Sequence, residues 1–309
     1  MRVAVIDLGT NTFNLIIAEA EDRQIKILYS EKISVKLGKG GIGRNIILPD
    51  AFDRGLTALN AHNQVIRNFK AEKIIALGTS ALRTAENAND FVSTVKEKFN
   101  IDVEIISGIR EASLIYHGVL QTLENQQNNF LILDIGGGSN EFIIANGQEM
   151  LWKESFKLGM ARLIDKFKPS DPITLAEIYE MEKYFDKELK PLFDELSKTE
   201  ICSLVGAEGA FESLYNMVQY SDTQNFHPKN GNKSKSLDIQ GLLRLHEKLI
   251  KSTSLERMKM KGLEPYRVDM IIPATIFINY IIRQLKTESV QVSPYSMKEG
   301  AAWEVLFGQ

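Results

Sequence analysis

Several residue types are scarce in this chain of 309 residues, and each scarcity excludes a class of protein. A single cysteine, Cys202, excludes an internal disulfide framework and fits a reducing compartment. The four histidines have no metal-ligand spacing. The most apolar stretch, residues 270–282, is too short to span a bilayer and is interrupted by Pro273 and Asn279, so it predicts a buried helix and no membrane span.

The chain also has no excess of positive charge. Against 40 Asp and Glu there are 37 Lys and Arg, which gives a net charge of −3. Such a chain does not attract polyanions as a whole, and it shows no helix-turn-helix, zinc-finger or aromatic-basic signature, so we expect no nucleic-acid partner. The chain begins with a strand-like segment and without a signal-peptide pattern, which predicts a cytoplasmic location.

What the sequence does contain is one short pattern that occurs twice. Residues 3–19 read VAVIDLGTNTFNLIIAE, and residues 131–146 read LILDIGGGSNEFIIAN. Each copy predicts a buried strand, an acidic residue (Asp7 or Asp134), a glycine-containing turn and a returning strand. In this register the other equivalent residues are Gly9 and Gly136, and Asn14 and Glu141.

Such a hairpin has the chemistry of a phosphate site. Glycines let backbone N–H groups approach phosphate oxygens, and an Asp beside the turn can hold a divalent cation. Two hairpins that face each other would grip a phosphate chain and its metal from both sides. The alternative for Asp7 is that its carboxylate only bonds to its own turn.

The duplication also sets the expected domain organisation. Residues 1–124 predict a first lobe with the order βββαβαβα, and residues 125–297 repeat that order with larger insertions. A last helix within 298–309 could pack back on the first lobe. Strands that alternate with helices predict an α/β fold of two related lobes, each a mixed sheet covered by helices, with a cleft between them.

Three segments of the second lobe carry more specific predictions. Residues 175–192 and 267–285 each predict one continuous helix. Residues 221–236 predict an unpatterned polar loop, which carries three lysines, Lys229, Lys233 and Lys235. The interpretation that we favour is a solvated loop; the alternative is that these cations contact a polyphosphate chain that leaves the cleft.

Four motifs follow one another along the chain, beginning at residues 6, 78, 105 and 133 with the sequences IDLGTN, GTSALR, IISGIRE and LDIGGGS. In order and spacing they resemble the exopolyphosphatase / guanosine pentaphosphate phosphatase (Ppx/GppA) family of the actin-like, or ribonuclease H-like, superfold. Weaker similarities extend the resemblance over nearly the whole chain, at LGMARL, VGAEGA, RVDMIIPA and SPYSMKEG. The four stronger motifs are IDLGTNTFNLIIA at 6–18, GTSALRTAENANDF at 78–91, IISGIREASLIYHGV at 105–119 and LDIGGGSNEFIIA at 133–145.

The resemblance implies a phosphohydrolase that uses Mg²⁺ to release the terminal phosphate of inorganic polyphosphate. Guanosine pentaphosphate is the alternative substrate, because the shared motifs do not separate the two. An ATP-dependent kinase of the same superfold and a sensor that binds polyphosphate or a nucleotide without turnover remain as further alternatives. A homodimer is also an expectation.

The resemblance assigns roles to individual residues. Glu111 corresponds to the catalytic base, and Arg83 to the cation on the scissile phosphate. Glu141 corresponds to the family's second cleft carboxylate, which binds the metal or places the water. Asp134 is the better candidate for the magnesium ligand, directly or through a water molecule. Asp7 is the equivalent residue of the first lobe. The expected donors to phosphate are Thr10, Asn11, Gly136, Gly137, Gly138 and Ser139.

This chain departs from the family pattern at several positions, of which Asn140 in place of a threonine is a mild one and three others are charged. Arg110 replaces a glutamate beside the presumed base, where it could either depress the pKa of Glu111 or contact phosphate. Glu208 lies in a turn expected to face phosphate and is expected to repel it. Lys298 replaces the usual arginine before Glu299.

Overall fold

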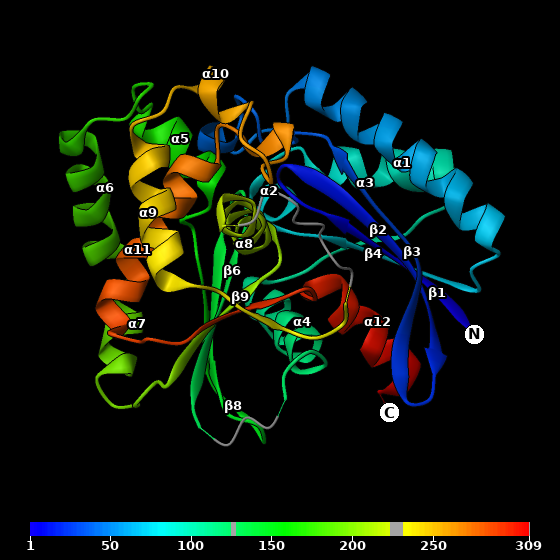
Figure 1. Cartoon of the computed structure of the whole chain (residues 1–309). Helices are drawn as coiled ribbons and strands as arrows, with labels where there is room; N and C mark the ends of the chain where they lie inside the picture. The colour runs from blue at the N-terminus through cyan, green and yellow to red at the C-terminus, as the bar shows by residue number, and fades with distance from the viewer. Residues whose placement is uncertain (125–127, 223–230, 309) are drawn as a thin grey trace.

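The computed structural model of the chain describes residues 1–124, 128–222 and 231–308. It contains two mixed sheets, and helices cover each of them (Figure 1). The predicted α/β fold with two related lobes is confirmed. Within the described ranges, no helix combines the length and the apolar character needed to cross a membrane.

The first sheet has the strand order β3-β2-β1-β4-β5. Strands β1, β2 and β3 form an antiparallel meander, and β4 and β5 continue parallel to β1. Asp7 on β1 lies directly opposite Asn14 on β2. The strands are β1 (Arg2–Leu8), β2 (Thr12–Glu21), β3 (Gln24–Ser34), β4 (Lys73–Gly78) and β5 (Val103–Ile105).

The second sheet repeats this connectivity, with the order β10-β11-β9-β6-β7-β8. A meander of β6, β7 and β8 is followed by β9 parallel to β6 and β11 parallel to β9, while β10 adds an antiparallel edge. Asp134 lies opposite Glu141, so the two hairpins share one register. The strands are β6 (Phe130–Ile135), β7 (Asn140–Ala145), β8 (Met150–Phe156), β9 (Ser203–Ala207), β10 (Lys235–Ser236) and β11 (Val290–Ser293).

Helices are distributed over both lobes. The first lobe contains η1 (Ile42–Arg44), α1 (Pro49–Phe69), α2 (Ser80–Thr84), α3 (Ala88–Phe99) and α4 (Gly108–Leu120). The remainder of the chain contains α5 (Met160–Phe167), α6 (Leu175–Glu188), α7 (Lys190–Leu196), α8 (Gly209–Asp222), α9 (Ile239–Ile250), α10 (Ser254–Arg257), η2 (Pro265–Arg267), α11 (Ile271–Leu285) and α12 (Met297–Phe307).

Three local predictions for the second lobe were wrong in detail. The helix predicted over 175–192 is divided into α6 and α7, because Pro191 lacks an N–H and fits only the first turn of a new helix. The helix predicted over 267–285 begins at Ile271, after the short η2. Strand β10 lies in the predicted polar loop, of which residues 223–230 fall outside the described part.

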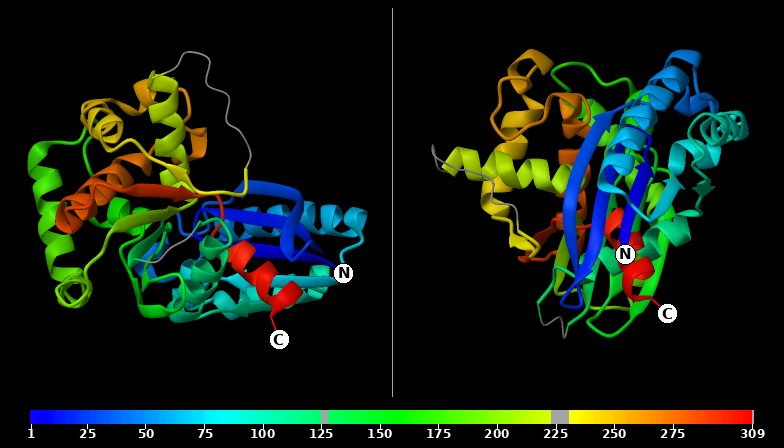
Figure 2. Two further views of the ribbon diagram at one scale, coloured as in Figure 1. Left: turned by 60° about the horizontal axis from the view of Figure 1, so that its bottom comes forward. Right: turned by 90° about the vertical axis from the view of Figure 1, so that its right-hand side faces the viewer.

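The two lobes share part of their hydrophobic core. One cluster of buried side chains joins Val5 and Ile16 of the first sheet to Ile132 and Ile143 of the second. Helices α4 and α12 contribute to the same cluster, and α12 packs against α4 and β1 (Figures 1 and 2). The C-terminal helix therefore lies on the first lobe, although its sequence follows the second.

Candidate active site

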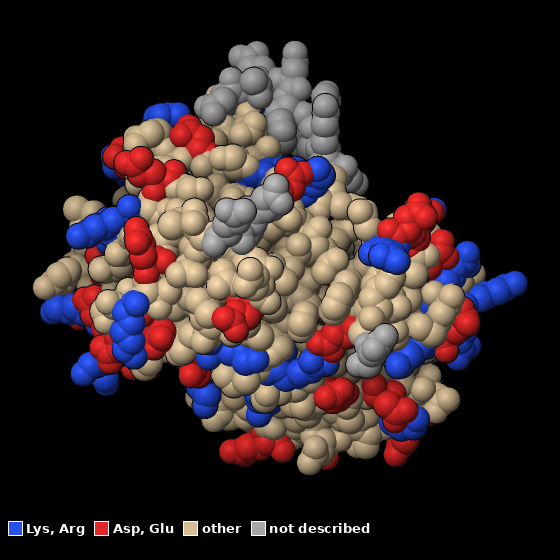
Figure 3. All heavy atoms as spheres, turned by 90° about the horizontal axis from the view of Figure 1, so that it is seen from below, with Lys and Arg blue, Asp and Glu red and all other residues tan. Residues whose placement is uncertain are grey.

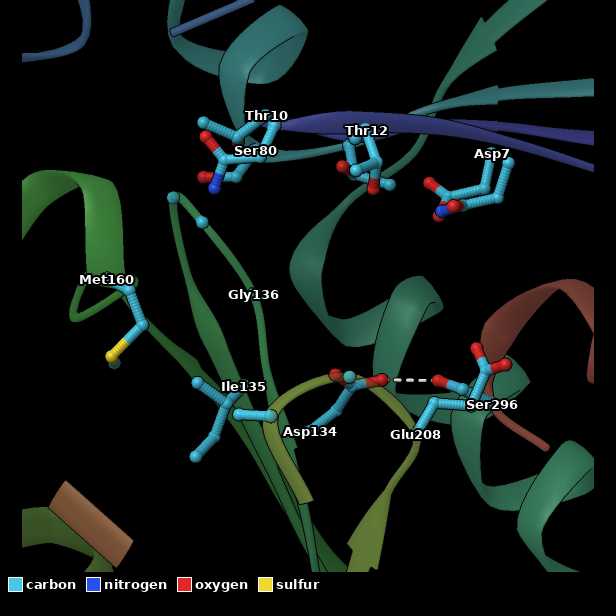
Figure 4. A pocket seen from close by; sticks show the side chains of 18 of the residues that line it. Asp7, Thr10, Thr12, Ser80, Asp134, Ile135, Gly136, Met160, Glu208 and Ser296 are labelled. Atoms are coloured by element: carbon cyan, nitrogen blue, oxygen red, sulfur yellow. Dashed lines mark hydrogen bonds between the residues drawn. The ribbon is translucent and has the colours of Figure 1, made fainter. Parts of the chain in front are cut away.

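A cleft of about 1050 Å³, part of it open to solvent, lies where the two hairpins face each other. Asp7 and Thr12 come from the first lobe, and Asp134 and Gly136 face them from the second (Figure 4). Arg83 forms an ion pair with Glu111 and is not among the residues that line the cleft. The other residues assigned from the sequence all line the cleft, namely Asp7, Thr10, Asn11, Glu111, Asp134, Gly136, Gly137, Gly138, Ser139 and Glu141.

Both turns are closed by the same backbone hydrogen bond. The N–H of Gly9 donates to the carbonyl of Thr12 at 3.1 Å, and the N–H of Gly136 donates to the carbonyl of Ser139 at 3.0 Å. The expectation that Gly136 offers its N–H to phosphate was therefore wrong, since that donor is used inside the turn. The N–H groups of Gly137 and Gly138 have no hydrogen-bond partner within the described residues.

The glycines of the second turn also make room for the first. A Cβ on Gly137 would lie 2.3 Å from Nδ2 of Asn11, and a Cβ on Gly138 would lie 2.5 Å from Oγ of Ser80. The two turns are in direct contact, and side chains at these positions would force them apart. Glycine is thus required here by packing between the lobes as well as by any ligand.

The aspartates of the hairpins are both partly buried at the cleft and surrounded by protein, which disfavours their charged forms. Burial raises the pKa of Asp7 to about 6, although the amide of Asn14 donates to its carboxylate at 2.7 Å and opposes the rise. Burial also raises the pKa of Asp134, to about 7, against the hydrogen bond from Ser296 and with a further rise from the charge of Glu141. Figure 4 shows the contact between Asp134 and Ser296.

Glu111 lies in the first turn of α4, whose N-cap is Ser107. The hydroxyl of Ser107 accepts the N–H of Arg110 at 3.1 Å, which fixes the start of the helix. Burial and the charge of Glu141 raise the pKa of Glu111 well above its usual range, and Arg83 opposes them. Such a carboxylate binds a proton more strongly than an exposed one.

Arg83 connects Glu111 to both lobes. Its Nη1 donates to Oε2 of Glu111 and to the carbonyl of Ile106, both at 2.9 Å, and its Nη2 donates to Oγ of Ser139 at 3.3 Å. Glu141 is held separately, by the hydroxyl of Ser155 at 2.7 Å. Burial raises the pKa of Glu141 as well.

Neither expectation for Arg110 was right. Its guanidinium forms a two-pronged ion pair with the carboxylate of Glu304 on α12, with one prong at 2.8 Å. It neither contacts the phosphate cleft nor depresses the pKa of Glu111, which is raised. A residue next to Glu111 on a helix points to a different face, and here that face packs against α12.

The expectation that Glu208 repels phosphate also needs correction. Glu208 lines the cleft, but its carboxylate is bonded to the buried ammonium of Lys298 and lies 3.5 Å from that of Lys32. Burial alone would raise the pKa of Glu208, whereas the two lysines lower it to about 2. Two of the departures from the family pattern, at 208 and 298, therefore form one ion pair whose charges compensate.

Sequence reasoning gave a role to Thr10 but none to Asn14, Arg267 or Ser296, which also line the cleft. Within the described residues, three buried atoms there lack a hydrogen-bond partner: Oγ1 of Thr10, Oδ1 of Asn14 and Nε of Arg267. Buried polar groups without partners indicate a place for a polar ligand. Arg267 and Ser296 fall in the weak motifs RVDMIIPA and SPYSMKEG, which were the only signal for them.

Arg162, in the weak motif LGMARL, was missed for the same reason. Its guanidinium donates to the carbonyl of Gly138 at 2.9 Å, to the carbonyl of Ile42 at 3.2 Å and to the hydroxyl of Thr84 at 3.0 Å. One side chain of the second lobe thus ties the second turn to two segments of the first lobe.

The donor set of the cleft fits Mg²⁺. The hairpins present carboxylates and the unpaired Oδ1 of Asn14, and oxygen ligands are those that Mg²⁺ prefers. Within the described residues, no three Asp, Glu, His or Cys side chains converge closely enough to form a complete protein cage for a metal. Mg²⁺ does not require one, since it keeps several waters and is held by one or two carboxylates together with substrate phosphates.

The loop lysines do not line the cleft where the structure describes them. Lys233 forms an ion pair with Glu124, and the ammonium of Lys235 lies 5.3 Å from the ring centre of Tyr215. Lys229 lies outside the described residues.

Two lobes of one topology around a carboxylate-lined cleft define a two-lobed, actin-like α/β protein. The model of the Ppx/GppA phosphatase family matches residues 16–307, and the chain belongs to that family. It is similar to the crystal structure of an exopolyphosphatase from Cytophaga hutchinsonii, with a TM-score of 0.96 and 37% identity over 100% of this chain and 98% of that one.

Two further relatives extend the comparison. A member of the family from Aquifex aeolicus shares the fold with a TM-score of 0.82 and 24% identity, covering 99% of this chain and 97% of that one. A Haemophilus influenzae protein is 26% identical over 304 residues, which are 98% of this chain and 91% of that protein.

Proposed function

We propose that this protein is a Mg²⁺-dependent exopolyphosphatase, which releases the terminal phosphate of inorganic polyphosphate by water attack. The observation that carries the proposal is the position of Glu111. Its buried, basic carboxylate faces a cleft that two carboxylate-bearing hairpins enclose. The family membership and the similarity to an exopolyphosphatase over the whole chain support the same activity.

In this proposal Glu111 orients a water molecule and accepts its proton. The guanidinium of Arg83 holds Oε2 of Glu111 at 2.9 Å, and it places a positive charge beside Ser139 at the second turn. That charge stabilises the oxygens of a terminal phosphate held at the turn. The free N–H groups of Gly137 and Gly138 and the hydroxyl of Thr10 add uncharged donors.

Asp134, with Asp7 and Glu141 as the other carboxylates, would hold the metal. When bound, Mg²⁺ neutralises charge on the phosphate oxygens and acts as a Lewis acid. Lys32, Lys298 and Arg267 line the other part of the cleft, around Glu208. These cations would hold the leaving polyphosphate, and Glu208 keeps two of them in place.

The experiment is to incubate the purified protein with Mg²⁺ and, separately, with long-chain polyphosphate, guanosine pentaphosphate and ATP, and to measure released phosphate. We expect release from polyphosphate and none after chelation of the metal. Release from guanosine pentaphosphate alone would replace the substrate, and binding of polyphosphate without any release would show a sensor. Transfer of phosphate from ATP to an acceptor would show a kinase.

A further inference from the structure

A second hollow lies away from the cleft, among the C-terminal ends of α8 and α9 and the segment around α10. These three helices lie together in the upper part of the left view in Figure 2. We call this feature the lysine hollow, because four of its lining residues are Lys248, Lys251, Lys259 and Lys261. The other lining residues are Met217, Tyr220, Ser221, Leu245, Ser252, Glu256 and Met260.

The four lysines are not used in the protein's own ion pairs. All four are exposed, and none of their ammonium groups forms a salt bridge or a hydrogen bond with another described residue. Among the described residues, the only carboxylate in the lining belongs to Glu256, which accepts from the backbone N–H and the hydroxyl of Thr253 in a capping box. Four positive charges therefore line one hollow against the single described carboxylate of Glu256, whose pKa is lowered by its hydrogen bonds from Thr253 and in part by the charge of Lys259.

This arrangement differs from the face of the molecule that is seen from below. The chain carries a net charge of −3, and on the face seen from below, Lys and Arg are interspersed with Asp and Glu (Figure 3). A lysine at a helix C-terminus is common, since it interacts favourably with the helix dipole. That effect accounts for Lys248 and Lys251 near the end of α9, but Lys261 lies four residues beyond the end of α10.

Two segments connect the lysine hollow to the active-site cleft. Helix α8 begins at Gly209 in the lining of the cleft and reaches the hollow at Met217 and Tyr220, which is on the order of 10–15 Å along the helix axis. The chain from Lys259 to Arg267 also leads from the hollow to the cleft. There the buried Nε of Arg267 makes no hydrogen bond with a described residue and lies 3.5 Å from Oε2 of Glu264.

We propose that the lysine hollow is a second binding site for linear polyphosphate, which holds a distal part of the chain whose terminal phosphate lies in the cleft. This inference rests on the proposed function. A flexible polyanion of repeated phosphates can contact cations at both ends of α8, whereas a short one cannot. Engagement at two linked sites strengthens binding without any change at the reacting phosphate.

The test compares two variants that change the net charge equally. One variant removes the hollow's charges (K248Q/K251Q/K259Q/K261Q), and the control removes four exposed lysines elsewhere (K98Q/K187Q/K190Q/K286Q). For long-chain polyphosphate, we expect the first variant to raise KM about tenfold or more and the control to change it little. For tripolyphosphate, neither kcat nor KM should change in the first variant, which also shows that it folds.

A third variant and a binding measurement complete the test. The charge-preserving variant K248R/K251R/K259R/K261R should keep the wild-type KM for long chains. Binding of long-chain polyphosphate to Glu111→Gln protein, with and without the four Lys→Gln changes, tests the hollow without turnover, so it remains informative if the proposed activity fails. Equal affinities in that comparison, or a control variant as weak as the first, would overturn the second site.

Discussion

The two hairpins have the same backbone hydrogen bonds but carry different side chains. Both place an aspartate at the end of the first strand, and both close the turn with the same N–H to carbonyl bond. The first hairpin sets neutral Asn14 opposite its aspartate, whereas the second sets Glu141 there. The first turn carries the side chains of Thr10 and Asn11, and the second carries bare glycines at the equivalent positions.

These differences are complementary. The side chains of the first turn occupy the space that Gly137 and Gly138 leave free, so the turns can touch. The second hairpin brings two carboxylates into the cleft and the first brings one, so negative charge is concentrated on the second lobe. A duplicated element can therefore keep its fold while one copy specialises in charge and the other in polar side chains.

The largest effect is expected at Glu111, which faces both hairpins and belongs to neither. Glu111→Gln should lower kcat by about 10²–10⁴-fold, because an amide has the same shape but cannot accept a proton from water. Binding of polyphosphate should be nearly unchanged. The control is Glu104→Gln, an exposed glutamate on β5. Full turnover by the Glu111 variant would remove this residue from the mechanism.

The next effect compares the two aspartates directly. Asp134→Asn should raise the Mg²⁺ concentration needed for half-maximal activity by at least about 10–100-fold. Loss of even an outer partner of a metal ligand has an effect of that size. Asp7→Asn should raise this concentration less, because Glu141 remains beside Asp134 in the second hairpin. Magnesium titrations of activity measure both. If Asp7→Asn has the larger effect, the metal belongs to the first lobe.

The contact between the turns can be broken without touching a carboxylate. Gly137→Ala should reduce the free energy of unfolding by about 1–3 kcal/mol, since the new Cβ would overlap with Nδ2 of Asn11. Adding Asn11→Ala should restore part of the loss, and chemical denaturation of the single and double variants measures the coupling. Additive losses would mean that the glycine is not required by this contact.

The smallest change makes the second hairpin resemble the first. The charge of Glu141 helps to raise the pKa of Glu111, so Glu141→Gln should lower that pKa. Glu111 acts as a base only when deprotonated, so the acidic limb of the pH profile of kcat/KM should move to lower pH. The measured quantity is the apparent pKa of the acidic limb, and the maximal value of kcat/KM does not enter the comparison. Glu149→Gln, at an exposed site of the same lobe, should leave the limb in place.

Much of the cleft could be predicted because its parts are local. The spacing of Asp134 and Glu141 across a short turn decides that they lie opposite each other on paired strands, and the same holds for Asp7 and Asn14. The start of α4 at Gly108, with Glu111 in its first turn, follows from the cap at Ser107. Helix ends were less predictable, as the break before Pro191 shows.

The partners of the charged residues could not be predicted, because they are far apart in the sequence. Arg110 is 194 positions from Glu304, and Lys298 is 90 positions from Glu208. Arg110, next to Glu111 in the sequence, points to another face of the helix, and the packing of that face against α12 decides which residue it contacts. Arg110 and Glu208 depart from the family motifs in the sequence. In the fold each forms an ion pair, Arg110 with Glu304 and Glu208 with Lys298.

The sequence by itself determined the repeat, the hairpins and the types of side chain that they carry, because strand periodicity and turn chemistry act over a few residues. Only the tertiary structure decided that the hairpins touch, that Arg83 holds Glu111, and that Ser296 from the far end of the chain bonds to Asp134. Those contacts depend on how two lobes and a returning C-terminal helix pack together. Burial in that packing is also what raises the pKa values of the cleft carboxylates.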